Sequence, residues 1–155
     1  MNISDIIGLT ITEIRYTYTY QNEYDMQEFY AYLKLSNELI IEIPQYSDLE
    51  LNESTERNQI FNEAKTPNKD CTKRIENQKI VDIHFCYCYN EQDFDSKAYI
   101  ELENGTYFTE ENRGPQGFTN IDLEMLNKSE FEKRVAELDE NSEIKSYLAE
   151  IKNIY

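Results

Sequence analysis

The chain has 155 residues, of which 30% are charged and 39% hydrophobic, with 13 tyrosines and a formal net charge of −16. This length predicts one domain with a sizeable core, and regular apolar and aromatic patterns argue against disorder. So acidic a chain repels phosphate backbones and anionic lipid, which disfavours direct binding to nucleic acid or membranes and favours a basic protein partner. The acidity is equally explained if it only keeps the protein soluble.

The N-terminal sequence and the cysteines indicate a cytoplasmic protein. Residues 1–10 (MNISDIIGLT) lack a basic region followed by an apolar run, so we expect no signal peptide. No segment approaches the ~20 apolar residues of a membrane span. Cys71, Cys86 and Cys88 form no CxxC motif, and one histidine does not complete a zinc site. We therefore expect reduced thiols, no metal and no cofactor.

An internal repeat organises the chain. Residues 80–89 (IVDIHFCYCY) align with residues 11–20 (ITEIRYTYTY) at an offset of 69, and four of the ten positions are identical. Side chains alternate across a strand, so each stretch presents one aliphatic and aromatic face. We expect the face with Ile14 and Tyr16 to point inward. In the second copy we expect the same of the face that carries Ile83.

The repeat predicts two tandem β-β-β units. Their hairpin turns are Asn37-Glu38 and Asn104-Gly105, the second being the strongest short hairpin signal, and tight hairpins imply antiparallel pairing. A duplicated unit of this kind usually closes about a pseudo-twofold axis, as one six-stranded curved sheet or a small barrel-like sandwich. The expected strands are 9–21, 29–36 and 39–43 in the first unit (9–43), and 80–89, 98–103 and 106–110 in the second (79–110).

The rest of the chain is expected to be loop and helix. Residues 44–78 form an insert in which only 58–65 has helical character, and such a long connection is either mobile or functional. Residues 111–119 are a loop by their Gly and Pro content. From residue 120 to 155 apolar residues recur at helical spacing, which predicts helices that cover the sheet. The predicted fold class is α+β: one domain of tandem duplicated antiparallel β-β-β units, about six strands, followed by C-terminal helices.

The acidic connections after the first strand of each unit are the first candidate site. They lack the EF-hand spacing, and nothing in the sequence orders their carboxylates for acid–base chemistry. They are either solvated loops or a patch that meets Lys and Arg side chains of a protein partner. The residues are Glu23, Asp25 and Glu28 in the first unit, and Glu91, Asp93 and Asp95 in the second.

Outer-face tyrosines are the second candidate. Tyr32 and Tyr99 stand at matching positions, and tyrosine is a common interface anchor, although covering helices would explain them equally well. A nucleophilic pair of Cys86 and His84 would share a strand face, but the sequence offers no orienting acid and no oxyanion loop. The first unit carries Arg15 at the position of His84, so we interpret this pair as packing residues and expect no catalytic residue.

One stretch resembles a known class of proteins. Residues 99–123 (YIELENGTYFTEENRGPQGFTNIDL) read as strand, Asn-Gly turn, strand, Gly/Pro loop and helix. This order is similar to a pattern that recurs in small acidic cytoplasmic bacterial proteins, some of which are immunity proteins for secreted polymorphic toxins. The resemblance implies a dedicated inhibitor that binds its cognate toxin without enzymatic activity, and it carries over no residue roles.

Two functional hypotheses follow. The first is a non-enzymatic protein-binding module, an immunity protein or acidic inhibitor that blocks a basic partner such as a nuclease toxin, with the acidic field steering association. The alternative is a small enzyme or ligand-binding module with a polar pocket between the two units, lined by Tyr18 and Tyr87. A scaffold role is a third, less specific interpretation.

Overall fold

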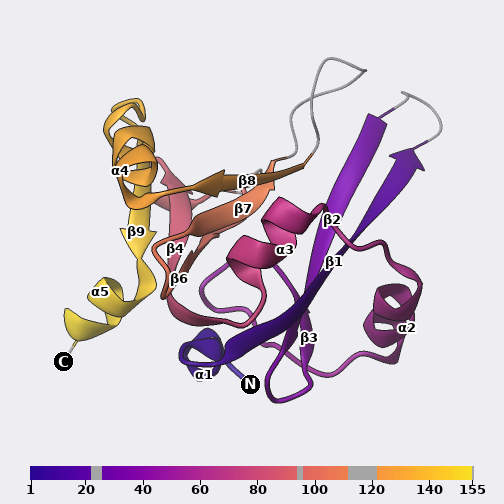
Figure 1. Ribbon diagram of the computed structural model, residues 1–155. Helices are drawn as coiled ribbons and strands as arrows, with labels where there is room; N and C mark the ends of the chain where they lie inside the picture. Colours follow the sequence, from indigo (N-terminus) through magenta and orange to yellow (C-terminus); the bar gives the residue numbers. More distant parts are fainter. Residues whose placement is uncertain (22–25, 94–95, 112–121, 155) are drawn as a thin grey trace.

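Nine strands and five helices make up the part of the chain that the computed structural model describes, residues 1–21, 26–93, 96–111 and 122–154 (Figure 1). The strands form one antiparallel sheet, so the expected α+β class with antiparallel pairing is confirmed. The strands are β1 (Thr10–Gln21), β2 (Met26–Leu35), β3 (Ile40–Glu42), β4 (Gln78–Cys88), β5 (Glu91–Gln92), β6 (Tyr99–Leu102), β7 (Tyr107–Glu111), β8 (Asp122–Leu126) and β9 (Ser142–Ser146).

The sheet order is β3-β2-β1-β4-β6-β7-β8, with β5 and β9 pairing with β4 beside this path. None of the helices that the structure describes is both long and apolar enough to cross a membrane. The helices are α1 (Ile3–Ile6), α2 (Thr55–Glu63), α3 (Lys69–Ile75), α4 (Lys128–Ala136) and α5 (Tyr147–Lys152). Figure 1 shows α2 on the side of β1 to β3, and α4 and α5 on the side of β4 to β9.

Both halves of the sheet use the same strand register. Strand partners coincide when the first half is shifted by 69 residues for the first strand and by 67 for the next two. The side chains therefore meet in equivalent pairs across each half. The pairs are Ile14 with Leu33 and Leu33 with Ile41 in the first half, and Ile83 with Ile100 and Ile100 with Phe108 in the second.

A β-bulge near the start of each long strand corrects the expected inner faces. The register shifts between Ile11 and Glu13 in β1, and the same shift follows Ile80 in β4. A bulge sets two residues opposite one, so strict alternation of faces fails there. Ile11 and Ile14 are consequently both buried, as are Ile80 and Ile83, whereas alternation had put Ile11 on the outer face.

The two halves meet where β1 and β4 begin, through reciprocal backbone hydrogen bonds. The N–H of Gly8 donates to the carbonyl oxygen of Ile80 (2.8 Å), and the N–H of Asn77 donates to the carbonyl oxygen of Ile11 (2.7 Å). Gly8 and Asn77 both have positive φ, 93° and 62°. Because the pairing is antiparallel, β1 and β4 leave this junction in opposite directions.

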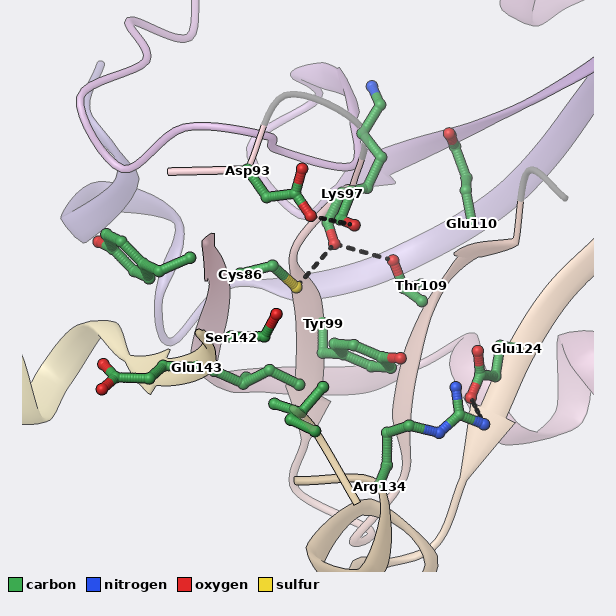
Figure 2. Close-up of a pocket in the computed structure, with 14 residues that line it drawn as sticks. Cys86, Asp93, Lys97, Tyr99, Thr109, Glu110, Glu124, Arg134, Ser142 and Glu143 are labelled. Atoms are coloured by element: carbon green, nitrogen blue, oxygen red, sulfur yellow. Dashed lines mark hydrogen bonds and ion pairs between the residues drawn. The ribbon is translucent and has the colours of Figure 1, made fainter. Parts of the chain in front are cut away.

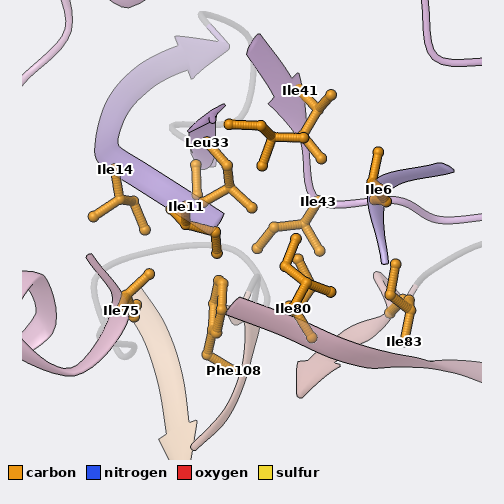
Figure 3. Packing of buried hydrophobic residues seen from close by; sticks show 14 of the residues in the cluster. Ile6, Ile11, Ile14, Leu33, Ile41, Ile43, Ile75, Ile80, Ile83 and Phe108 are labelled. Atoms are coloured by element: carbon orange, nitrogen blue, oxygen red, sulfur yellow. The ribbon is translucent and has the colours of Figure 1, made fainter. Parts of the chain in front are cut away.

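One main core joins both halves. Figure 3 shows Ile11, Ile14 and Leu33 of the first half packed near Ile80 and Phe108 of the second. All five side chains are buried, and α1 and α3 add further isoleucines to the same cluster. Burying an aliphatic side chain of this size contributes about 1.5–3 kcal/mol, so this shared cluster is the main attraction between the halves.

The expectation of helices throughout residues 120–155 is only partly right. α4 forms as predicted, with the amide N–H of Glu130 donating to Oδ1 of Asn127 (2.8 Å) and the amide N–H of Asn127 donating to Oε1 of Glu130 (3.0 Å). Residues 122–126 and 142–146 form β8 and β9 instead, because they pair with β7 and with the far end of β4. Open sheet edges thus override the helical spacing of apolar residues.

The insert is more regular than expected. The short helix predicted at 58–65 is α2, which begins three residues earlier at Thr55. α3 was not expected, and its N-cap is Asn68, whose Oδ1 accepts the amide N–H of Cys71 (3.0 Å). Most of the loop predicted at 111–119 lies outside the described residues.

The hairpin turns provide a matched test of backbone strain. Glu38 (φ 70°) and Gly105 (φ 83°) occupy the same place in the β2–β3 and β6–β7 turns. Glycine adopts positive φ without a Cβ penalty, so Glu38→Gly should raise the free energy of unfolding by about 0.5 kcal/mol. Gly105→Ala should lower it by about 1 kcal/mol, since a Cβ at Gly105 meets no atom within 4 Å and only the backbone is strained.

Urea unfolding of both variants measures these differences. The exposed ion pair between Lys34 Nζ and Glu38 Oε2 (3.0 Å) is lost in Glu38→Gly, but such pairs contribute little. Shifts of the same sign in the two variants would contradict the equivalence of the turns.

Candidate functional site

A cavity of about 270 Å³ opens beside the C-terminal end of β4 (Figure 2). Its walls come from β4, β6, β7, β8 and β9, from α4, and from the segment after β5. Aromatic and small side chains, among them Tyr87 and Tyr99, form part of the lining. The charged residues of the lining are Asp93, Lys97, Glu110, Glu124, Arg134 and Glu143.

The strands β5 and β9 position carboxylates at the end of β4. Tyr87 of β4 pairs with Gln92 of β5 and with Glu143 of β9. The amide nitrogen Nε2 of Gln92 donates to the hydroxyl of Tyr87 (3.1 Å). Lys145 Nζ lies 4.6 Å from the centroid of the Tyr87 ring and 3.4 Å from Oε2 of Glu143. This region of the sheet therefore holds a cation against an aromatic ring and a carboxylate.

An ion pair joins α4 to β8 at the cavity wall. Nη2 of Arg134 lies 2.6 Å from Oε1 of Glu124, whose side chain is 11% exposed. Figure 2 shows the guanidinium of Arg134 reaching Glu124 from the helix below. The carboxylate of Glu124 compensates the positive charge of Arg134, so this part of the cavity lining attracts an anion only weakly.

Glu110 is a buried carboxylate that links the two halves. Its side chain lies on β7, and Oε1 accepts the backbone N–H of Ala31 on β2 (2.8 Å). Its other oxygen, Oε2, has no hydrogen-bond partner among the described residues. Burial raises the pKa of Glu110 to about 7, while Lys97 and the bond from Ala31 lower it and the charge of Glu42 raises it further.

Cys86 and His84 do not form a nucleophilic pair. Burial, with the charges of Asp93 and Glu124, raises the pKa of the Cys86 thiol to about 11, so the reactive thiolate is scarce at neutral pH. The imidazole instead lies against Glu101, with 2.7 Å between Nε2 and Oε2. This geometry agrees with the interpretation of both residues as packing residues.

Asp82, His84 and Glu101 form a polar cluster on the outer face of β4 and β6, in which Glu101 is half-buried. Their potential ligand atoms all lie within 4.8 Å of one another, and Asp, His and Glu are residue types that bind zinc. Each carboxylate is already engaged, however: Asp82 accepts the hydroxyl of Ser146 and the amide N–H of Leu148 (3.2 Å). The hydrogen bond from His84 lowers the pKa of Glu101. The cluster thus ties β9 and α5 to the sheet.

The predicted site residues lie in different environments. Glu91 is exposed on β5, and Asp93 lines the cavity, where it accepts the hydroxyl of Ser96 (2.9 Å). Glu28 is on β2 with its backbone paired to Thr19, but its side chain is not described. Glu23, Asp25 and Asp95 lie outside the described residues.

The two predicted tyrosine anchors are buried, and this corrects their expected role. Tyr32 and Tyr99 are each 7% exposed. Phe61 of α2 packs in one cluster with Tyr32, and Phe131 of α4 contacts Tyr99 with ring centroids 5.4 Å apart. Helices therefore cover both rings, which removes them as exposed anchors for a partner.

Several cavity residues escaped the sequence prediction. Glu124 and Glu143 were placed on helices, but they belong to β8 and β9 and so face the cavity. Glu110 stands 67 residues after Ile43, which is buried in the first half. A carboxylate at the position of a buried aliphatic residue was the one signal in the sequence that could have revealed this site.

Comparisons of this chain with protein-family models, with curated proteins and with solved structures find no match.

The raised pKa of Glu110 predicts a pH dependence of stability. Its pKa is higher in the folded state than the ordinary value of about 4.3, so the folded state disfavours the carboxylate. The contribution of Glu110 to stability is greatest below pH 4 and falls as the pH rises to about 7, by up to about 3 kcal/mol. Glu110→Gln removes this dependence while keeping an oxygen for Ala31.

Urea unfolding at pH 5, 6, 7 and 8 tests the effect. Relative to Glu110→Gln, the wild-type protein should lose stability over this range. Glu63→Gln, an exposed acid on α2, is the matched control and should follow the wild-type curve. Parallel curves for Glu110→Gln and wild type would refute the assignment.

Proposed function

We propose that this protein is a non-enzymatic binding module, an immunity-type acidic inhibitor that blocks a basic protein such as a nuclease toxin. The observation that carries the proposal is the net charge of −16 together with the carboxylates on both strands that flank the end of β4. Glu91 and Glu143 are exposed there, and Asp93 is half-buried at the cavity. The backbones of Glu91 and Glu143 are held in strands of the sheet, so the positions of these two carboxylates are restricted.

The mechanism follows from charge. A nuclease binds phosphate through lysine and arginine side chains, so its active-site cleft is basic. An acidic protein is steered to such a cleft and meets its cations with carboxylates, which excludes the nucleic acid. No chemical step is needed for inhibition of this kind.

Two features support binding over catalysis. The thiol of Cys86 is held protonated by burial, and His84 is occupied by Glu101. Cys86 and His84 are the residues that the sequence analysis considered as a nucleophile and its base. Cys71, Cys86 and Cys88 form no disulfide bond, which fits the cytoplasmic location that we propose.

We also infer that the sheet arose by tandem duplication of a β-β-β unit. Support comes from the equal registers, the bulge repeated after Ile11 and Ile80, and the reciprocal bonds of Gly8 and Asn77. Under this proposal the first half is chiefly scaffold. The second half gained β5, β8 and β9, and the cavity lies among these additions.

The cavity itself favours a second candidate, a ligand-binding module. Its charged groups converge on a volume suited to a small molecule, although it lies within the second half of the sheet and not between the units. Native mass spectrometry of the purified protein separates the two candidates. A retained small molecule of constant mass would favour ligand binding over protein inhibition.

The inhibitor proposal predicts a protein partner whose association depends on salt. The tagged protein, isolated from its native host, should copurify with a basic protein that mass spectrometry identifies. The association rate of the purified pair should fall at least about tenfold between 50 and 500 mM NaCl, because salt screens the steering field. A rate that does not change with salt would count against steering, and the absence of any copurifying protein would count against inhibition.

A further inference from the structure

The turn between β4 and β5 holds a tyrosine in an unfavourable backbone conformation. Cys88, the last residue of β4, pairs with Glu91, so Tyr89 and Asn90 alone connect the strands. Their φ angles are 52° and 64°. Positive φ at both positions is the pattern of a type I′ turn, which favours Asn and Gly and disfavours bulky side chains. Local folding preference therefore does not explain a tyrosine at position 89.

Packing does not explain this tyrosine either. Tyr89 is 72% exposed, the most exposed aromatic side chain in the described part of the chain. Its backbone N–H donates to the carbonyl oxygen of Asn141 (2.8 Å), and Nδ2 of Asn141 lies 3.5 Å from its hydroxyl. These contacts hold the turn against the segment before β9 and leave the ring in solvent. An uncovered aromatic side chain on a turn whose backbone is held in place is typical of an interface anchor.

Carboxylates stand on both segments that flank this turn. Glu91 follows the turn on β5, and Glu143 stands on β9 opposite Tyr87. Asp139 and Glu140 come directly before Asn141, and Oδ1 of Asp139 accepts the backbone N–H of Asn141 (2.9 Å). All four acids are exposed. Glu143 is paired with Lys145 (3.4 Å), but Glu91 on one flanking segment and Asp139 and Glu140 on the other still provide negative charge, which matches a cation and opposes an anion.

We propose that Tyr89 anchors the interface with the basic partner and that its ring receives a lysine or arginine side chain of that protein. A cation lies favourably over a tyrosine ring, and Lys145 already does so on Tyr87, two residues earlier. Glu91 and Glu140 pair with further basic side chains at the rim. This inference rests on the proposed function, because it names the surface at which that partner binds.

The peptide acetyl-Gly-Arg-Gly-Arg-Gly-amide is a probe that requires no knowledge of the partner. Titrated into the ¹⁵N-labelled full-length protein, it should cause its largest amide shifts at residues 88–92 and 139–143. Tyr89→Asn should weaken its binding about threefold, the value of an exposed cation–π contact. Shifts spread evenly over the acidic surface, including α2, would overturn the proposal.

Stability separates an interface role from a structural one. Asn adopts positive φ more readily than Tyr, so Tyr89→Asn should raise the midpoint of thermal unfolding while it weakens binding. A lowered midpoint would assign the ring a structural role and overturn the proposal. The double variant Glu56→Gln/Glu63→Gln removes two exposed charges on α2 and controls for charge. It should change peptide affinity less than Tyr89→Asn does.

The copurified partner provides the decisive measurement. Tyr89→Asn should weaken its binding about tenfold or more, as substitution of an interface hot spot does. An unchanged affinity would overturn the role of Tyr89 and leave the inhibitor function standing. If no protein copurifies but the peptide still binds at Tyr89, the cation-binding surface is supported and the inhibitor function fails.

Discussion

The antiparallel junction of β1 and β4 is the constraint on which the rest of the structure depends. The reciprocal bonds of Gly8 with Ile80 and of Asn77 with Ile11 set the two strands in opposite directions from a common point. Each half alone would be a small sheet with one apolar face exposed to water. Joined in this way, the halves bury those faces in one core, and their outer faces are left for helices to cover.

The covering of the outer faces differs between the halves, and this difference creates the candidate site. α2 covers Tyr32 in the first half, whereas α4 covers Tyr99 in the second. β5 and β9 extend the far end of β4 on both of its edges, and β8 extends β7. The cavity is lined by β8 and β9 and by the segment after β5, and the exposed turn at Tyr89 connects β4 to β5. The proposed binding surface is thus carried on strands, which hold their side chains more rigidly than a loop would.

Charge acts differently inside the protein and on its surface. The buried carboxylates are hydrogen-bonded, as Asp82 is to Ser146 and Leu148, and Glu110 in addition has a raised pKa. The exposed carboxylates stay in water, where they create a long-range field and also repel one another, which lowers the stability of the compact state. The proposed inhibition of a basic protein depends on the exposed carboxylates. The buried carboxylates limit the pH range over which the fold is most stable.

The sequence by itself determined the strand cores in both halves of the sheet, their hairpin turns and the helix that forms as α4, because these depend on local periodicity and turn chemistry. Tertiary structure decided the bulges, the pairing of residues 122–126 and 142–146 as strands, and the burial of Tyr32. Helical spacing predicts a helix only when no sheet edge is available to pair with, and the sequence does not reveal such an edge. The cavity and the position of Tyr89 depend on those edges, so only the folded chain could place the acids of β5 and β9 around one exposed ring.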